Sequence, residues 1–585
     1  MKSRHNYLYF FAFLLAAALR FIQLGALPLT DTEATWALQA LSAAQGERTL
    51  LGGQIGYIAL TSLPFYALES TNFLARFWPA FVGSFIVFLP YFIYKSPLSP
   101  LSPSGGENNP FPLRGKARMG ASEGAAITLA FLLAIAPGLV AVSRQANGTM
   151  LALTFGAFAW GMWKNDNPKW VGIFAGIALL GGTSVWIALL GILLTWALAQ
   201  NLLPEEDVDE TESSPNQARI RKDDLKVAAI FMGGTILLIS TRLFLSPNGL
   251  SAWFTSLADY LRGWRFASGV PSLRVFGGLF AYYPLALFFG TIASVRGLLE
   301  KNRFSLALSL WSIIAFTLAL IYPARQVSDL IWAILPLWVL SATEITRYFR
   351  MPSYDRNETF GVFALTFILL IFSWLNLATA GVLPQNFEFT NQHQLLLAGS
   401  LILLFLSLAL IAYGWSVEVA TLGGVWGILL ALGIYTLGTA WGATGLRTPK
   451  GVEIWDSAPR VAQAGLLHQT ISDISTWSRG DDQALNIVIT GINSPALNWM
   501  LRNHYVEEAL SLDPSASPDL VLTPQTEELA LAASYRGQDF IWRTSPDWLT
   551  MNSWAKWMVL REVPKQSEEI ILWARNDLFF DSQNQ

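Results

Sequence analysis

The chain has 585 residues, of which 53% are hydrophobic and only 14% are charged, and its formal net charge is −3. These values lie far from those of a soluble globular domain, and the lack of a basic stripe argues against a nucleic-acid-binding protein. The sequence contains no cysteine, which excludes disulfide bonds, thiol nucleophiles and cysteine-bound zinc. Apolar runs of about 20 residues recur over the first three quarters of the chain, and each is long enough to cross a bilayer.

We therefore predict a mainly α-helical protein, a polytopic transmembrane bundle of about 13 helices followed by a small extramembrane α/β domain. Lys and Arg gather in alternate short loops, which predicts a cytoplasmic N-terminus and an outer-facing chain after residue 441 in the plasma membrane. The predicted spans lie near 7–24, 77–94, 122–141, 150–163, 170–184, 186–200, 227–245, 275–295, 304–321, 330–346, 359–381, 395–413 and 422–441.

The first outer loop carries two acidic residues, Asp31 and Glu33, directly after the first span. Thr30 or Asp31 is suited to cap a helix that we predict from about Ala34 to Ala44, with the acids in its first turn. The first turn of a helix also holds a catalytic carboxylate in a fixed position. The loop alone leaves both the capping role and the catalytic role open.

The cations predicted on the outer face before the C-terminal domain are all arginines, among them Arg76, Arg144 and Arg325. A guanidinium is a planar fork that suits bidentate binding of phosphate, such as that of a lipid at the outer interface. Arginine also anchors lipid headgroups, and Arg325 has Asp329 close by as a partner for an ordinary ion pair. Phosphate binding and headgroup anchoring therefore both stay open for these arginines, as does an ion pair with Asp329 for Arg325.

From about residue 450 the apolar runs shorten to strand length. Strands are predicted at 485–490, 519–523, 539–542 and 569–574, with helices near 458–478 and 494–504. This pattern indicates a small α/β domain on the outer face. We place the transmembrane domain at 1–445 and the outer domain at 446–585.

Three motifs of the bundle together resemble the C-type superfamily of membrane glycosyltransferases. The first is the acidic motif Asp31-Thr32-Glu33 of the first outer loop, where members of that superfamily show Asp-x-Glu, Asp-x-Asp or Asp-Glu. The second is RFWPAFVG from Arg76, which is similar to a helix opening Arg-x-x-Pro-Ala. The third is SRQANGT from Ser143, at a place where members read Ser-Arg-x-x-Arg-x-Asp.

The C-terminal domain is similar to that of one subgroup, described as glycosyltransferase family 39-like and related to protein O-mannosyltransferases. The resemblance rests on NWMLRNHY at 498–505 followed by PDLVLTP at 518–524. One departure concerns the third motif of the bundle, where members often carry a second carboxylate and this chain has Gly148 and Thr149. Either the first-loop acids suffice here, or the chain is a relative without activity.

The resemblance implies transfer of a sugar from a polyprenyl-phosphate-linked donor in the membrane to a protein, lipid or glycan acceptor, with inversion at the anomeric carbon. It makes Asp31 the base that takes the acceptor proton, with Glu33 positioning or replacing it. Arg325, Arg144 and Arg76 become the candidates that bind the donor phosphate. A divalent cation, Mg²⁺ or Mn²⁺, held by the two acids is the one cofactor that remains open.

Two other interpretations belong to different classes of protein. One is a transporter or flippase for lipid-linked sugars, although the sequence has no clear repeat and little charge in mid-span. The other is a catalytically silent membrane scaffold that presents the outer domain to a partner. The enzyme interpretation predicts that Asp31, Arg325 and Arg144 converge on one cavity.

Overall fold

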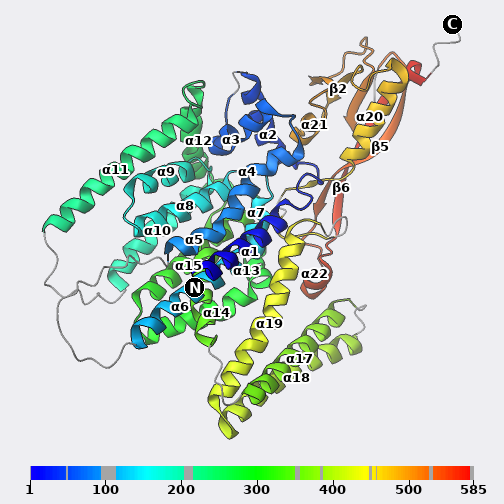
Figure 1. The fold of residues 1–585 in the computed structure, drawn as a ribbon. Coiled ribbons are helices and arrows are strands. Elements are labelled where there is room, and N and C mark those ends of the chain that lie inside the picture. The colour runs from blue at the N-terminus through cyan, green and yellow to red at the C-terminus, as the bar shows by residue number, and fades with distance from the viewer. Residues whose placement is uncertain are drawn as a thin grey trace.

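The structure is a computed structural model of the chain, in which a large helical bundle carries a six-stranded sheet at one end (Figure 1). It describes residues 2–47, 50–93, 113–202, 215–349, 356–382, 387–446, 451–455, 458–525, 531–551 and 553–579.

Each of the predicted spans overlaps a helix of the bundle. Short 3-10 turns join some of them: η1 (Ile86–Phe88), η2 (Val327–Leu330) and η3 (Thr346–Tyr348). The bundle helices are α1 (Lys2–Phe21), α4 (Asn72–Phe85), α5 (Leu89–Ile93), α6 (Leu113–Ala134), α7 (Pro137–Ser143), α8 (Thr149–Lys164), α9 (Pro168–Leu179), α10 (Ser184–Leu202), α11 (Pro215–Ser240), α13 (Ser272–Tyr282), α14 (Pro284–Leu299), α15 (Arg303–Ile321), α16 (Ile331–Ile345), α17 (Arg356–Val382), α18 (Phe387–Gly414) and α19 (Val417–Ala443).

Within the described residues, seven helices are long and apolar enough to cross a membrane, or up to nine if each bent pair counts as one span. Two predicted spans are such bent pairs, α6 with α7 at 54° and α13 with α14 at 85°. Each second helix begins with a proline, which lacks the N–H that a continuous helix would use. Other predicted spans are short: α9 has 12 residues and rises only about 18 Å.

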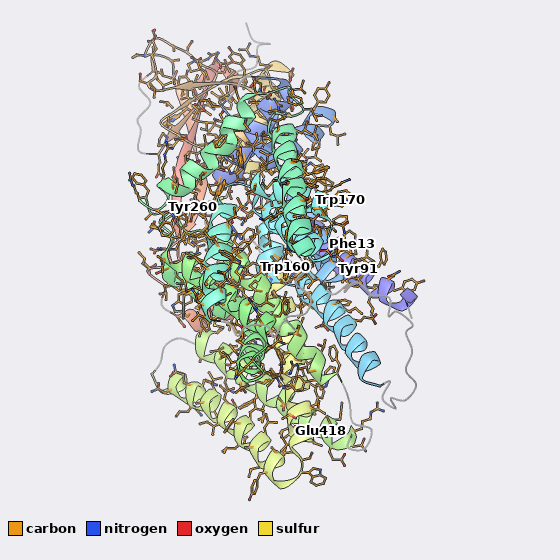
Figure 2. The ribbon with its side chains drawn as sticks, turned by 90° about the vertical axis from the view of Figure 1, so that its left-hand side faces the viewer. Phe13, Tyr91, Trp160, Trp170, Tyr260 and Glu418 are labelled. Atoms are coloured by element: carbon orange, nitrogen blue, oxygen red, sulfur yellow. The ribbon has the colours of Figure 1, made fainter. Side chains whose placement is uncertain are left out.

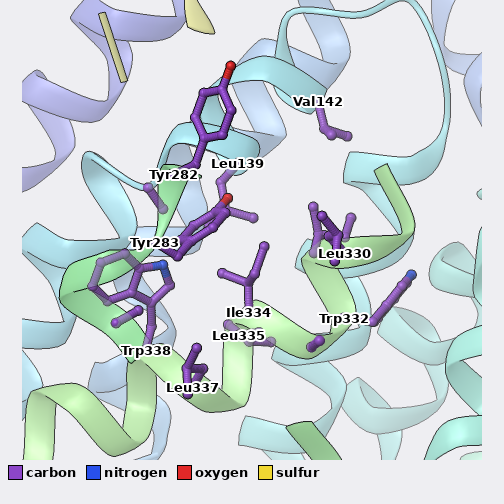
Figure 3. Close-up of a cluster of buried hydrophobic side chains, with 14 of the residues drawn as sticks. Leu139, Val142, Tyr282, Tyr283, Leu330, Trp332, Ile334, Leu335, Leu337 and Trp338 are labelled. Carbon is purple, nitrogen blue, oxygen red and sulfur yellow. The ribbon is translucent and has the colours of Figure 1, made fainter. Parts of the chain in front are cut away.

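Helix α16 is the buried centre of the bundle. Its side chains pack with those of α7, α13 and α14 in the main hydrophobic core, where Figure 3 shows Tyr283 and Trp338 beside the leucines of α16. Trp338 and Tyr283 are fully buried, and the Tyr283 hydroxyl accepts a hydrogen bond from the Gly138 amide at 2.7 Å. Val327 and Leu330, in the turn η2 directly before α16, are buried in the same core.

Three shorter helices lie at the end of the bundle that carries the sheet (Figure 1). They are α2 (Asp31–Gln45), α3 (Ile55–Ala67) and α12 (Asn248–Arg262). Helix α2 is the one predicted from the first outer loop. Figure 2 labels Tyr260 of α12 close to the sheet, while Glu418, at the start of α19, lies at the opposite end of the molecule.

The C-terminal domain, called the outer domain after the side of the membrane predicted for it, contains one mixed sheet with the strand order β1-β5-β6-β4-β2-β3. In this sheet β2 is parallel to β3 and β4, and the other pairs are antiparallel. Its elements are β1 (Arg460–Val461), α20 (Ala464–Arg479), β2 (Asn486–Thr490), α21 (Pro495–Met500), β3 (Tyr505–Ala509), β4 (Leu520–Pro524), β5 (Tyr535–Pro546), α22 (Trp554–Leu560), β6 (Lys565–Arg575) and η4 (Asn576–Phe579).

All four predicted strands are present, and β5 and β6 extend well beyond the predicted ranges. The predicted helix at 458–478 is partly wrong, because its first residues form β1 and the helix begins only at Ala464. β1 and β3 were not predicted. They are the two edges of the sheet, where strands are short and half-exposed and therefore lack an apolar run.

The bundle and the outer domain share their cores. Val452, Ile454 and Trp455 enter the main core of the bundle, together with Trp557 of α22. A second core joins α2 and α3 to the sheet, with alanines of α2 packed against side chains such as Leu497. The sheet is therefore fixed over the first outer loop by apolar packing on both sides.

Candidate functional site

A cavity of about 370 Å³ lies where the bundle meets the outer domain. Its wall is built from the start of α2, the turn between α7 and α8, the turn η2, and the segment that leads into β1. The charged side chains among its lining residues are Glu33, Arg76, Arg144, Asp329, Glu453 and Arg460. Four of these come from the bundle and two from the chain after residue 450.

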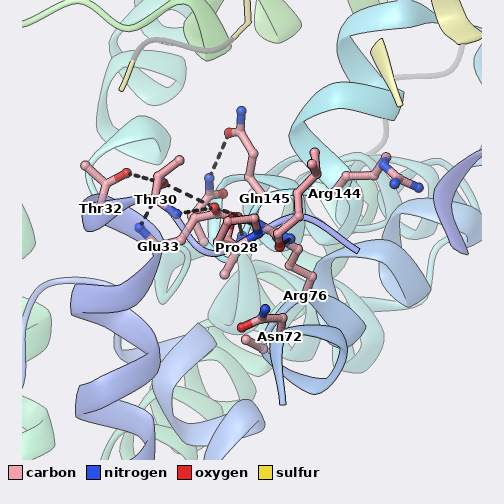
Figure 4. A network of polar contacts seen from close by, with 12 residues as sticks. Pro28, Thr30, Thr32, Glu33, Asn72, Arg76, Arg144 and Gln145 are labelled. Atoms are coloured by element: carbon pink, nitrogen blue, oxygen red, sulfur yellow. Dashed lines mark hydrogen bonds and ion pairs between the residues drawn. The ribbon is translucent and has the colours of Figure 1, made fainter. Parts of the chain in front are cut away.

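Glu33 and Arg76 form a buried bidentate ion pair in the wall (Figure 4). Arg76 Nε donates to Glu33 Oε1 at 2.8 Å, and Arg76 Nη2 donates to Oε2 at 2.7 Å. The same guanidinium also donates to the carbonyls of Leu27 and Pro28, at 2.8 and 3.0 Å. Arg76 therefore ties α4 to the loop that leads into α2.

Three further donors bind the Glu33 carboxylate. They are the Thr30 amide at 3.0 Å, the Thr30 hydroxyl at 3.1 Å and the Ala146 amide at 3.0 Å. Burial by itself raises the pKa of Glu33, but the charge and hydrogen bonds of Arg76, with those of the two amides, hold it below its usual range. Thr30 and Glu33 form a capping box, so the capping role predicted for this loop is present.

Asp31 faces the outer domain. Its Oδ1 accepts hydrogen bonds from the Ser494 hydroxyl at 2.6 Å and from the Ala496 amide at 3.1 Å, and its Oδ2 accepts one from Arg543 Nε at 2.7 Å. Among the described residues of the cavity wall, Asp31 is not found, whereas its neighbours Thr32 and Glu33 are. Asp31 thus binds the N-terminal end of α21, where Ser494 is the N-cap, and joins it to α2.

The two other arginines predicted to bind phosphate have backbone partners. Arg144 lines the cavity, but its Nη1 donates to the carbonyls of Arg20 and Ile22, both at 2.9 Å, where it closes the C-terminal end of α1. Arg325 donates to the carbonyl of Val270 at 3.0 Å and lies outside the described cavity wall. The structure thus brings Glu33, Arg76 and Arg144 together, and leaves Asp31 and Arg325 outside.

Asp329 is the acid of the cavity wall that the sequence named only as a partner for Arg325. It is buried, and its Oδ2 accepts a hydrogen bond from the Gln326 amide at 2.8 Å. The Ser184 hydroxyl is a second hydrogen-bond partner. Asp329 sits in the capping box of η2, directly before α16, so the central helix of the bundle holds it in place.

Gly148 and Thr149 stand where members of the superfamily often carry a second carboxylate, and the backbone is tightly packed at Gly148. A Cβ atom on Gly148 would lie 2.6 Å from the Gly181 carbonyl oxygen, so no side chain fits there without a backbone shift. Thr149 does line the cavity, beside Asn147 and Gln54. The wall at this place is neutral and polar.

Asp31 and Glu33 do not offer a divalent cation a common set of ligands, because each carboxylate is bound to a different arginine. Within the described part of the chain, no group of three or more His, Cys, Asp or Glu side chains is arranged to hold a metal ion. Mg²⁺ and Mn²⁺ need several converging oxygen ligands. The two acids as they stand do not fit the ion that the sequence left open.

Two charged residues of the cavity wall were missed by the sequence analysis. Glu453 is buried, accepts a hydrogen bond from the Tyr282 hydroxyl and lies 3.6 Å from Arg561 Nε. Arg460 is on β1, and its Nη1 donates to the Gly451 carbonyl at 3.2 Å. No spacing in the sequence signals these residues, because the packing of the outer domain on the bundle brings them to the cavity.

No family model matches the chain, and no curated protein matches it. Its fold is similar to that of ArnT from Cupriavidus metallidurans. The crystal structure of ArnT bound to undecaprenyl phosphate has a TM-score of 0.53 and 12% sequence identity, covering 98% of this chain and 99% of that one. The apo structure has a TM-score of 0.51 and 12% identity, covering 98% of each chain. The likeness over the whole chain confirms the expected fold, a helical bundle followed by a small domain with a sheet. The long apolar helices among the described residues are those of an integral membrane protein.

Proposed function

We propose that this protein transfers a sugar from a polyprenyl-phosphate-linked donor to an acceptor at the end of the bundle that carries the outer domain. The fold supports this class of reaction, since a protein with the same fold over its whole length binds undecaprenyl phosphate. The observation that carries the proposal is the cavity itself, in which one carboxylate, Asp329, lies among neutral polar groups.

The neutral groups suit a sugar. Hydroxyls and amides can each donate and accept hydrogen bonds, as sugar hydroxyls require. A wall made largely of uncharged polar groups suits an uncharged ring, so we expect a neutral sugar. The Gln, Asn, Ser and Thr residues of the wall are Gln23, Thr30, Thr32, Gln54, Gln145, Asn147, Thr149, Thr183, Ser184, Gln326, Ser328 and Thr444.

We assign the base to Asp329 in place of the first-loop acids. Glu33 has five hydrogen bonds from Arg76, Thr30 and Ala146, which leave little room for an acceptor hydroxyl. Asp31 is held by the outer domain. Asp329 is bound by one backbone amide and lies beside Ser184 in the wall.

The reaction then runs as one displacement. The acceptor oxygen attacks the anomeric carbon, and its proton passes to the Asp329 carboxylate. The bond from the anomeric carbon to the phosphate oxygen breaks at the same time, and the polyprenyl phosphate leaves with both electrons of that bond. Attack opposite the leaving group inverts the anomeric carbon.

The test uses purified full-length protein in lipid nanodiscs with undecaprenyl-phosphate-linked hexoses and a mixed acceptor pool. Asp329→Asn keeps the size of the side chain and removes the base, so we expect a loss of at least 100-fold in the transfer rate with donor binding unchanged. Asp259→Asn is the matched control, since Asp259 pairs with Arg262 on α12 and is half-exposed. Equal transfer rates in the two variants would refute the assignment of the base.

A second candidate function is a membrane scaffold that binds the lipid-linked sugar without transferring it. The observation that favours it is that both acids of the first-loop motif are engaged by arginines, Glu33 by Arg76 and Asp31 by Arg543. Binding of undecaprenyl phosphate by the wild-type protein, together with no turnover of any donor in the same preparation, would select this function over transfer.

A further inference from the structure

We propose that a second cavity, beside the end of α11, binds a phospholipid of the bilayer whose headgroup is phosphoethanolamine. This cavity has a volume of about 1080 Å³. Among the residues that the structure describes, it shares no lining residue with the cavity of the proposed transfer site. The inference therefore goes beyond the proposed function and does not depend on it.

The second cavity lies between α2, α3 and the turn that follows α11, at the end of the bundle that carries the sheet (Figure 1). Its wall is formed by the C-terminal end of α2, by α3 from Ala59 to Tyr66, and by residues between Leu238 and Asn248. The volume is at the upper end of the range of ligand pockets, about 300–1,000 Å³. It has room for a lipid headgroup with part of its acyl chains.

The rim of this cavity is apolar and exposed. Leu63 and Tyr66 of α3, with Leu243 and Leu245 of the turn, line the cavity and are each more than half exposed. Helix α11 overlaps the predicted span 227–245, so its end is predicted to lie at the surface of the bilayer. Exposed apolar side chains grouped at this level suit contact with lipid better than contact with water. The ligand that this rim fits is therefore a lipid.

One arginine, Arg242, stands in the wall of this cavity. Its Nη1 donates to the carbonyl of Ala43 in the last turn of α2, and its Nη2 donates to the Ser246 hydroxyl. Its Nε is buried and has no hydrogen-bond partner within the described residues. A buried donor without an acceptor is costly, and a guanidinium has more N–H donors than these two partners use. A phosphate oxygen supplies the acceptor that the wall lacks.

The backbone that carries Arg242 has an unusual conformation. Arg242, Leu243 and Phe244 follow one another with φ values of 48°, 58° and 70°. These values lie in the left-handed region, which residues other than glycine rarely adopt. Strained backbone of this kind gathers where a turn holds a ligand. Here the strained turn holds the guanidinium against the end of α2 and in the cavity wall.

The described part of the wall also contains one carboxylate, that of Glu47, which is exposed. The Glu47 amide donates to the Ser42 carbonyl at 3.0 Å, directly beside Ala43, whose carbonyl accepts from Arg242. The cation and the carboxylate thus lie at the same end of α2. A headgroup that carries both charges matches them, with its phosphate bound to Arg242 and its ammonium bound to Glu47.

The chemistry of the ammonium selects among the bilayer phospholipids. The primary ammonium of phosphatidylethanolamine has N–H groups that it can donate to a carboxylate, as a lysine side chain does. The choline group has a positive charge but no N–H, and the glycerol group of phosphatidylglycerol has no positive charge. Phosphatidylethanolamine is therefore the occupant to which the wall is best matched.

The test measures lipid binding by native mass spectrometry of the full-length protein, purified in detergent and freed of lipid. The probes are phosphatidylethanolamine, phosphatidylcholine and phosphatidylglycerol with the same acyl chains. Wild-type protein should bind phosphatidylethanolamine several-fold more tightly than the other two. For Arg242→Ala we expect a Kd about 10-fold higher for all three lipids, because each loses a charge-assisted contact with its phosphate.

Glu47→Gln tests the headgroup separately from the phosphate, because it leaves Arg242 and its contacts with α2 in place. The Kd for phosphatidylethanolamine should rise to that for phosphatidylcholine, since only the ammonium loses a charged partner. Phosphatidylglycerol should bind no more weakly than it does to wild type.

Two further variants distinguish a binding defect from a folding defect. Arg262→Ala is the matched control, since Arg262 is an exposed arginine of α12 outside the described wall, and it should bind all three lipids as wild type does. Ala59→Phe adds a ring where Ala59 lines the cavity, so it should weaken the binding of all three lipids while Arg242 still caps α2. If Arg242→Ala does not fold, Ala59→Phe and Glu47→Gln still decide the question.

Three outcomes would overturn the inference. The first is that Arg242→Ala binds phosphatidylethanolamine as tightly as Arg262→Ala does. The second is that Glu47→Gln leaves the order of the three lipids unchanged. The third is that undecaprenyl phosphate displaces phosphatidylethanolamine from wild type at a lower concentration than phosphatidylcholine does and is itself lost in Ala59→Phe, since the occupant would then be a lipid carrier. None of these measurements uses transfer activity, so the two proposals are tested separately.

Discussion

The first turn of α2 has one face toward the bundle and one toward the outer domain, and each face ends in a carboxylate bound to an arginine. On the bundle face, the side chains of Glu33 and Arg76 are 8% and 7% exposed. On the outer-domain face, those of Asp31 and Arg543 are 20% and 17% exposed. The same motif thus supplies one pair inside the bundle and one pair that joins two parts of the molecule, so its two acids have different tasks.

The comparison predicts the largest effect for Arg76→Ala. This change leaves a buried Glu33 carboxylate with three neutral donors, and breaking such a pair costs about 3–5 kcal/mol of folding free energy. Thermal unfolding in detergent, followed by tryptophan fluorescence, measures it. The control is Arg262→Ala, which removes an exposed pair with Asp259. Equal melting temperatures for the two variants would contradict the expectation that the buried pair contributes more stability than the exposed pair.

A smaller effect is expected for Arg543→Ala, about 1–2 kcal/mol, because Asp31 keeps its two hydrogen bonds from α21 and part of its surface is hydrated. The loss should be local and should loosen the sheet over α2. Hydrogen exchange should therefore rise in β1 and β5 while the core helix α16 stays protected. Lys556→Ala breaks a more exposed pair with Glu562 and serves as control. A uniform rise in exchange over the whole chain would contradict an interdomain role.

The smallest expected effect is that of pH, between 7 and 5.5, on the stability of the folded protein. The pKa of Glu33 is lowered in the folded protein, so its stabilising contribution is present above the unfolded pKa and is lost as the pH falls through the folded value. From pH 7 to 5.5 we expect a change of less than about 0.1 kcal/mol from this group, because both pKa values lie well below this range. Below the unfolded value, wild type should lose stability faster than Glu33→Gln. Parallel acid titration curves for the two proteins would contradict the assignment.

Much of the fold could be predicted because its signals are local. Apolar runs placed each bundle helix, and the sequence around Thr30 predicted a capped helix start that the structure contains. The buried strands β2 and β4 carry apolar runs and were found. The edge strand β1 has only two residues, and β3 alternates half-buried and exposed positions with two glutamates, so neither contains enough apolar sequence to be recognised.

The site was predicted only in part, and the reason is also physical. The motif located the right loop, and Glu33, Arg76 and Arg144 do line the cavity. The directions of the side chains depend on partners that the sequence does not name. Asp329 was predicted only as an ion-pair partner of Arg325. In the structure it takes part in the capping box of η2, and its side chain lines the cavity. Arg460 lies in a segment predicted as helix, so its position in an edge strand at the cavity was not foreseen.

By itself, the sequence determined the helices, the buried strands and the acidic turn at the start of α2, because hydrophobic runs and capping preferences act over a few residues. Only the tertiary structure decided what each acid does. The partner of Glu33 is 43 residues away and that of Asp31 is 512 residues away. Which arginine reaches which carboxylate follows from the packing of the sheet on the bundle, and that packing also places Asp329 and Arg460 in one cavity.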